Sequence, residues 1–176
     1  ENKNYFLFLL AVTDIIKEGS YLYYFCRDNN FISRAFNCND AQGVFAENIV
    51  PYTGNSQKFI DLLVYNGKIM MLQDAFLPDT PEYLKMDYTQ QQYDWCVANE
   101  ANIYNYFVEN NLIFGDDHRL VDRFISPGPF SKFYTEIDNE SSPMVGVFIG
   151  WQICKEYFKK KPDVKLVDFI KLNATD

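Results

Sequence analysis

The sequence predicts an all-α fold in a single domain that spans residues 1–176. Apolar residues recur at three- and four-residue intervals over long stretches, which is the spacing of one face of an α-helix. Helix-capping signals precede several of these stretches, and proline or asparagine clusters follow them. No stretch shows the convincing alternation of apolar and polar residues that indicates a half-buried strand. A chain of this length can bury one substantial core without disulfides or metals.

The two longest helices of the second half have clear boundaries. Thr89 and Gln92 have the spacing of a capping box, so they predict a long helix that runs to about Leu112. Ser56 is expected to cap a helix that ends near residue 77, because the segment beginning at Pro78 holds two prolines and cannot continue the backbone ladder.

Four further helices and one irregular region complete the expected order. Ser142 followed by Pro143 is expected to start a helix that ends near Lys160. The segment between residues 31 and 52 is expected to be irregular, with one short helix at about 44–49. The remaining expected helices are residues 5–27, a short one capped by Asp116 or Asp117 that reaches Ile125, and a last one at about 164–170.

The charge of the chain argues against binding to nucleic acid. The formal net charge is -8 and the pI is about 4.6, whereas nucleic-acid affinity rests on clustered lysine and arginine. The basic run Lys159–Lys161 is expected to be a solvated helix end. No run reaches the roughly eighteen apolar residues of a membrane span. No signal peptide is visible and Glu1 is not an initiator methionine, so we expect a mature or partial product.

The cysteines and the single histidine do not form a recognisable metal motif. Cys26, Cys38, Cys96 and Cys154 lack the close spacing of a zinc cluster, and we expect free thiols, buried in the case of the last two. A disulfide between two of these cysteines is the alternative, and it requires an oxidising compartment. His118 is expected to be exposed at a helix start, where it serves neither a zinc site nor a serine triad.

Several motifs follow one another in the last two thirds of the chain. They are Tyr65-Asn66-Gly67-Lys68, Asp74 to Pro81, Tyr88-Thr89-Gln90 with Trp95, Asn99-Glu100, Pro129 to Lys132, Asp138 to Ser141, and Gly146 to Trp151. In this order and at this spacing they resemble the GldB-like gliding-motility lipoproteins of Bacteroidetes. The resemblance covers residues 59–172, and residues 1–55 match less closely.

The resemblance implies an exported lipoprotein that is attached to the outer membrane, on its periplasmic or its surface side. The membrane contact would be a lipid anchor that is not seen in this chain. The resemblance also implies a zincin-like helical domain with a degenerate active site, because the family resembles remote relatives of zinc metallopeptidases. The segment around Asn66 would then occupy the position of a Glu-Gly ligand segment.

The residues that zinc hydrolysis needs are missing. A helical HExxH motif supplies two histidine ligands and a general base, and Asn66 is a poor substitute for a ligand carboxylate. We therefore expect no catalytic residue, no metal and no cofactor. A site made of carboxylates alone is the alternative, built from Asp14, Glu18 and Glu100, the last in an apolar stripe with Tyr93, Val97, Tyr104 and Phe107. Hydrogen bonds from buried tyrosine, lysine or tryptophan are the favoured explanation of those acids.

Glycine and tryptophan residues carry two further expectations. Gly67 lies inside an expected helix, and Gly146 and Gly150 share one face of another. All three glycines predict close packing of helices. Trp95 and Trp151 are expected in the core, although exposed coplanar rings would instead indicate a sugar-binding platform.

These observations together predict a non-catalytic envelope component. It would act in protein–protein assembly of a gliding-motility, secretion-associated or other outer-membrane complex, with envelope proteins as partners. Recognition would use an acidic, aromatic-rich cleft. A metal-dependent hydrolase with an unusual carboxylate site and a glycan-binding module are the alternatives. The candidate binding residues are Glu18, Asn66, Lys68, Trp95, Glu100 and Trp151.

Overall fold

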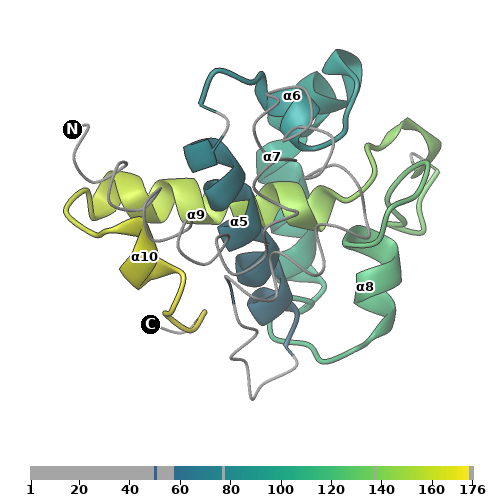
Figure 1. The fold of residues 1–176 in the computed structure, drawn as a ribbon. Helices are drawn as coiled ribbons and strands as arrows, with labels where there is room; N and C mark the ends of the chain where they lie inside the picture. The colour runs from purple at the N-terminus through teal and green to yellow at the C-terminus, as the bar shows by residue number, and fades with distance from the viewer. Residues whose placement is uncertain (1–49, 51–57, 77, 137, 175–176) are drawn as a thin grey trace, which may run out of the picture.

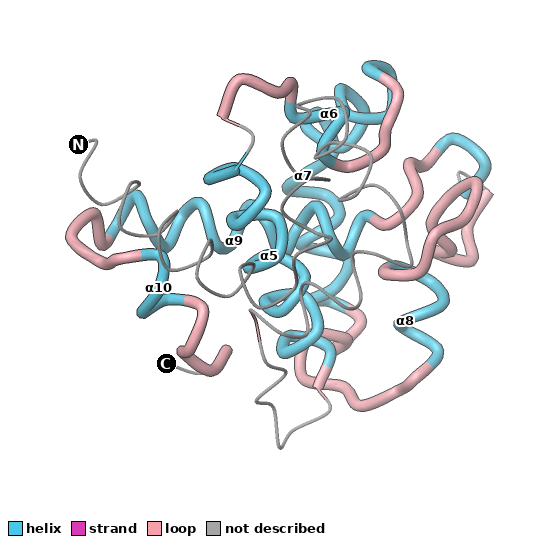
Figure 2. Tube along the Cα trace, viewed as in Figure 1, coloured by secondary structure: helices cyan, strands magenta, loops and turns pink. Residues whose placement is uncertain are grey.

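The computed structural model describes residues 50, 58–76, 78–136 and 138–174 of the chain. These residues form helices joined by loops, and no strand occurs among them (Figure 2). The all-α prediction is confirmed over this part of the chain. The helices expected at residues 5–27 and 44–49, and the expected cap Ser56, lie outside the described residues.

Helices α5, Phe59–Phe76, and α9, Val145–Lys160, form the centre of the fold and cross each other (Figure 1). Glycine makes the crossing close. A methyl group built on Gly150 would lie 1.9 Å from the carbonyl oxygen of Leu63, and one built on Gly67 would lie 2.2 Å from the carbonyl oxygen of Gly150. The two helix backbones therefore touch, as the glycine pattern predicts.

Helix α7, Gln90–Glu109, packs against α9 and begins with the predicted capping box. The Gln92 amide donates to the Thr89 hydroxyl at 3.2 Å, and the Thr89 amide donates to the Gln92 side chain at 2.8 Å. Two amides that the helix start would leave unpaired are thereby satisfied. The helix ends three residues before the expected Leu112.

Shorter helices surround these three. Helix α8 confirms the short helix expected near residue 120, and the Asp117 carboxylate accepts the Arg119 amide at its start at 3.0 Å. Helix α10 confirms the last expected helix. The sequence did not predict α6, because four residues are too few for a periodic pattern. These short helices are α6, Glu82–Lys85; α8, Arg119–Phe124; and α10, Leu166–Phe169, together with a 3₁₀ turn η1 at Asp138–Glu140.

The start of α9 differs from the prediction that Ser142 caps it. The residue before the helix is Met144, in a left-handed conformation with φ 49°. Its first amide, on Val145, donates to the hydroxyl of Ser131 at 3.2 Å. The Ser142 hydroxyl instead donates to the Gln92 carbonyl of α7 at 2.7 Å. The cap thus comes from a residue fourteen positions away, which local capping patterns do not reveal.

An aromatic cluster forms the core below the crossing of α5 and α9. Phe59, Phe107 and Phe124 are each at most 1% exposed, and their ring centroids lie 4.9 to 6.0 Å apart. The Phe59–Phe107 and Phe107–Phe124 pairs are edge-to-face, and such contacts add about 0.5–1.5 kcal/mol per pair beyond the burial of apolar area. This cluster ties α5, α7 and α8 together and holds α7 in place.

Candidate functional site

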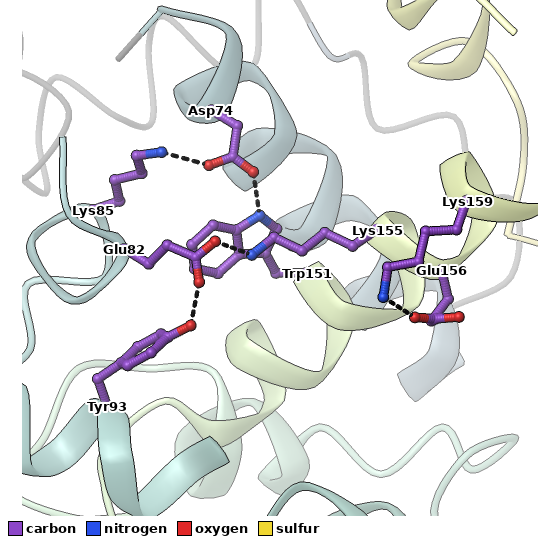
Figure 3. A network of polar contacts seen from close by, with 8 residues as sticks. All are labelled: Asp74, Glu82, Lys85, Tyr93, Trp151, Lys155, Glu156 and Lys159. Carbon is purple, nitrogen blue, oxygen red and sulfur yellow. Dashed lines mark hydrogen bonds and ion pairs between the residues drawn. The ribbon is translucent and has the colours of Figure 1, made fainter. Parts of the chain in front are cut away.

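A network of polar side chains lies where α5, α6, α7 and α9 meet (Figure 3). Its first half is built around Asp74, in the last turn of α5. One carboxylate oxygen accepts from Lys85 of α6 at 2.7 Å, and the other accepts from the indole nitrogen of Trp151 on α9 at 2.7 Å. Lys85 and Trp151 are 6% and 0% exposed. A buried ammonium of this kind requires the carboxylate beside it.

The second half of the network is built around Glu82 at the start of α6. Its two oxygens accept from the ammonium of Lys155 and from the hydroxyl of Tyr93. Lys155 also lies over the ring of Trp151, with its nitrogen 3.7 Å from the ring centroid. This cation–π contact joins the two halves into one network (Figure 3).

The network shifts the pKa values of its titratable groups. Burial raises the pKa of Glu82, but hydrogen bonds from Lys155 and Tyr93 and the positive charges of Lys155 and Lys85 lower it by more. The net result is a pKa below the ordinary value of 4.5. Burial, together with the hydrogen bond to Glu82 and its charge, raises the pKa of Tyr93. Glu82 is therefore held as a carboxylate and Tyr93 as a neutral phenol.

This arrangement balances charge and holds helices together. Asp74 and Glu82 are each paired with a lysine and with a second donor. Each oxygen of both acids accepts a hydrogen bond from a protein donor. Among residues 50, 58–76, 78–136 and 138–174, no group of three or more histidine, cysteine, aspartate or glutamate side chains could hold a metal ion.

The predicted binding residues do not gather in this network. Trp151 belongs to it, but this side chain is buried, so it is unavailable as a sugar-stacking platform. Lys68 is 5% exposed and donates to the carbonyl groups of Ile170 and Leu172 beyond α10. Asn66 donates to the carbonyl of Leu62 at 2.8 Å within its own helix.

Trp95 and Glu100 lie elsewhere on α7. Trp95 is half-buried against the core, and Glu100 is exposed to solvent. The expectation that Glu100 lies within a buried apolar stripe is wrong, because the buried stripe of α7 consists of Cys96, Ile103 and Phe107. Glu18 and Asp14 lie outside the described residues, so the carboxylate site that they would form with Glu100 stays a prediction.

Sequence reasoning missed most of the network. Asp74 lies in one of the family motifs, and Lys155 follows Trp151 by one helical turn, which is a usable signal for the cation–π contact. The partners of Glu82 give no such signal. Lys155 is 73 positions away from it and Tyr93 is 11 positions away.

A second feature of α7 is an exposed apolar stripe, which we call the α7 face. It consists of Val97, Ala101, Tyr104 and Val108, whose spacing of four, three and four residues places them along one side of the helix. Val97 is 50% exposed, Tyr104 45% and Val108 48%. Large apolar side chains that line up in this way on a surface are typical of a binding site.

The remaining predictions about single residues are confirmed where the structure describes them. Cys96 and Cys154 are buried free thiols, and burial raises the pKa of Cys96 to about 11 and that of Cys154 to about 12. His118 is exposed directly before α8, and Lys159 and Lys160 are exposed in the last turn of α9. None of the helices in the described ranges has the length and hydrophobicity of a membrane span.

Comparison with known proteins gives one match. The family described as "Gliding motility protein GldB" matches residues 23–176, which is most of the chain and extends the resemblance well before residue 59. No curated protein and no solved structure matches. Members of this family are lipoproteins associated with gliding motility at the cell envelope. The chain therefore belongs to the GldB family of gliding-motility lipoproteins.

Proposed function

We propose that this chain is a non-catalytic component of an envelope protein assembly and that it binds its partner through the α7 face. The observation that carries the proposal is the exposed row of Val97, Tyr104 and Val108. A helix that displays one apolar stripe to the core and a second to solvent leaves apolar area in contact with water, which a partner would cover.

The polar network supports binding in preference to hydrolysis. Lys85 pairs with Asp74 and Lys155 pairs with Glu82, so the two carboxylates of the network are charge-balanced. The Lys85–Asp74 contact fixes α6 against α5, and the Lys155–Glu82 contact fixes α6 against α9. We infer that the network keeps the helices in place for recognition. A zincin-like ancestry stays a prediction that rests on the family resemblance.

The proposal also moves the binding surface away from the expected cleft. Lys68 and Trp151 are buried, and Trp95 packs against the core. Among the candidates in the described part of the chain, Glu100 is on the surface, beside the α7 face, and Asn66 is partly buried. We propose that Glu100 contributes charge to recognition and that the two tryptophans and Lys68 stabilise the fold.

A matched pair of variants in the native host tests this function. Tyr104→Lys places a charge in the middle of the α7 face, whereas Asn102→Lys places the same charge on an exposed position of α7 outside it. We expect both variants to accumulate normally in the envelope. The unmodified chain should migrate in a high-mass complex on native electrophoresis; Tyr104→Lys should lose this complex and stop gliding, and Asn102→Lys should keep both. Unchanged assembly in both variants would contradict the proposal.

Metal analysis of the purified full chain separates binding from hydrolysis. The proposal predicts less than stoichiometric zinc after dialysis. Stoichiometric zinc that is lost in a Glu100→Gln variant would support the carboxylate site and overturn the non-catalytic assignment.

A further inference from the structure

We propose that the α7 face receives an amphipathic helix of a partner protein, with one apolar side and basic residues along both edges. This inference rests on the proposed function and names the class of partner. Three features of α7 support it: the length of the apolar stripe, the position of the acidic residues beside it, and the sign of the charge along the whole helix.

The shape of the α7 face fits another helix. The stripe from Val97 to Val108 covers twelve residues, which is a rise of about 16 Å or three helical turns. Its residues follow the spacing of three and four that lets side chains of one helix pack between those of another. A helix laid along this stripe would cover Val97, Ala101, Tyr104 and Val108 at once.

The charge beside the α7 face is acidic. Helix α7 contains no lysine, arginine or histidine. At roughly 100° per residue, Glu100 lies on one edge of the stripe and Asp94 on the other, and both are exposed. A partner with lysine or arginine along each edge of its apolar side would meet an opposite charge on both sides.

Lys159 of α9 carries a positive charge near Glu100. Lys159 of α9 is close enough to Glu100 for the carboxylate to contribute to its raised pKa, but the main causes are its hydrogen bond to Glu156 and the charge of that residue. Lys159 and Glu156 together add no net charge. The Lys159–Glu156 pair therefore does not cancel the negative charges of Asp94 and Glu100 on α7.

The same charges disfavour the two other obvious occupants. A second copy of this chain would bring its own Asp94 and Glu100 against those of the first, and like charges that meet at an interface oppose association. A bilayer rich in anionic lipids would repel the same two residues. A basic helix is the occupant whose charge and shape both match.

Two designed peptides test this inference with the full chain. Both form a helix with the same leucine-bearing side, and their edges carry lysine in one and glutamate in the other. Fluorescence anisotropy of the labelled peptides should show binding of the lysine peptide, at least about tenfold tighter than that of the glutamate peptide. Tyr104→Lys should weaken the lysine peptide by about tenfold or more, and Asn102→Lys should weaken it much less.

Removing the acids without changing their shape tests the role of charge. The double variant Asp94→Asn with Glu100→Gln should bind the two peptides with nearly equal affinity. Equal binding of both peptides to the unmodified chain, or binding of neither, would overturn the inference. The inference would also be overturned if the unmodified chain forms a dimer, or binds anionic vesicles, and Tyr104→Lys abolishes that association. If those results appear while Tyr104→Lys still disrupts the envelope complex, the proposed function stands and only the basic-helix partner is wrong.

Discussion

Replacing Gly150 by alanine should destabilise the protein by opening the crossing of α5 and α9. The added methyl group would lie 1.9 Å from the Leu63 carbonyl oxygen and 2.6 Å from its carbonyl carbon. Both atoms belong to the backbone, so no side-chain rotation relieves the contact. Since Cβ atoms essentially never approach closer than 3.0 Å, the helices must separate by at least the difference between 3.0 and 1.9 Å, which is 1.1 Å.

The size of the effect follows from two opposing contributions. Alanine is favoured over glycine in a helix interior by about 1 kcal/mol. A separation of about 1 Å removes a quarter to a half of the dispersion energy of each atom pair across the crossing, and overpacking of a core typically costs about 1–3 kcal/mol or more. Because the clash is with backbone, we expect the upper part of that range and a net loss of about 2 kcal/mol.

Urea unfolding followed by circular dichroism measures this loss. With a denaturant dependence of about 2 kcal/mol per molar urea, the midpoint of Gly150→Ala should fall by about 1 M. Gly128→Ala is the matched control, since the nearest atom to its added methyl group lies at 3.7 Å and its midpoint should hardly change. A Gly150→Ala midpoint equal to or above that of the unmodified chain would refute the close-crossing argument.

Three further predictions concern the buried polar groups and thiols. Asp74→Asn leaves the Lys85 ammonium buried without a carboxylate and should lower the free energy of unfolding in urea by about 3–5 kcal/mol. Adding Lys85→Met should recover much of this stability. If the losses of the two single variants simply add in the double variant, the pairing is contradicted. The pKa of Glu82 is lowered on folding from 4.5, so its stabilisation is present above that pH and is lost as the pH falls through the folded value. Acid unfolding of Glu82→Gln should therefore depend less on pH than that of the unmodified chain, and an identical profile would argue against the shift. Cys96 and Cys154, with pKa values raised to about 11 and about 12, should resist iodoacetamide at about pH 8 until urea is added; mass spectrometry showing rapid labelling of the folded chain would contradict their burial.

Local signals in the sequence predicted much of the helical framework. The capping box at Thr89 depends on residues three positions apart, and both of its hydrogen bonds are present. The prediction of close helix packing at Gly67 and Gly150 is also confirmed. A glycine inside a helix lowers stability, so its presence there indicates that another backbone approaches closely.

The sequence could not decide which apolar stripe of α7 is buried. Val97 and Tyr104 have the same spacing as Cys96 and Ile103 and lie next to them on the helix. Periodicity predicts a helix with apolar residues, but the packing of α9 and α8 decides which of the two stripes is covered. The sequence therefore predicts one apolar stripe that contains Glu100, Tyr93, Val97, Tyr104 and Phe107, whereas in the structure Glu100 is exposed to solvent.

Hydrogen bonds between residues far apart in the sequence could not be predicted from the sequence either. Asp74 meets Trp151 over 77 positions of sequence, and Ser131 caps a helix that a nearer serine was expected to cap. Such contacts depend on how the helices are assembled. Capping and spacing patterns act within a few residues.

Site-specific photo-crosslinking in the native envelope tests the central claim most directly. A photoreactive amino acid at position 104 should give a single adduct with one envelope protein, and the attachment point should lie in a basic amphipathic helix. The same group at position 102 should give little of that adduct. Equal crosslinking from both positions, or no adduct from position 104, would contradict recognition through the α7 face.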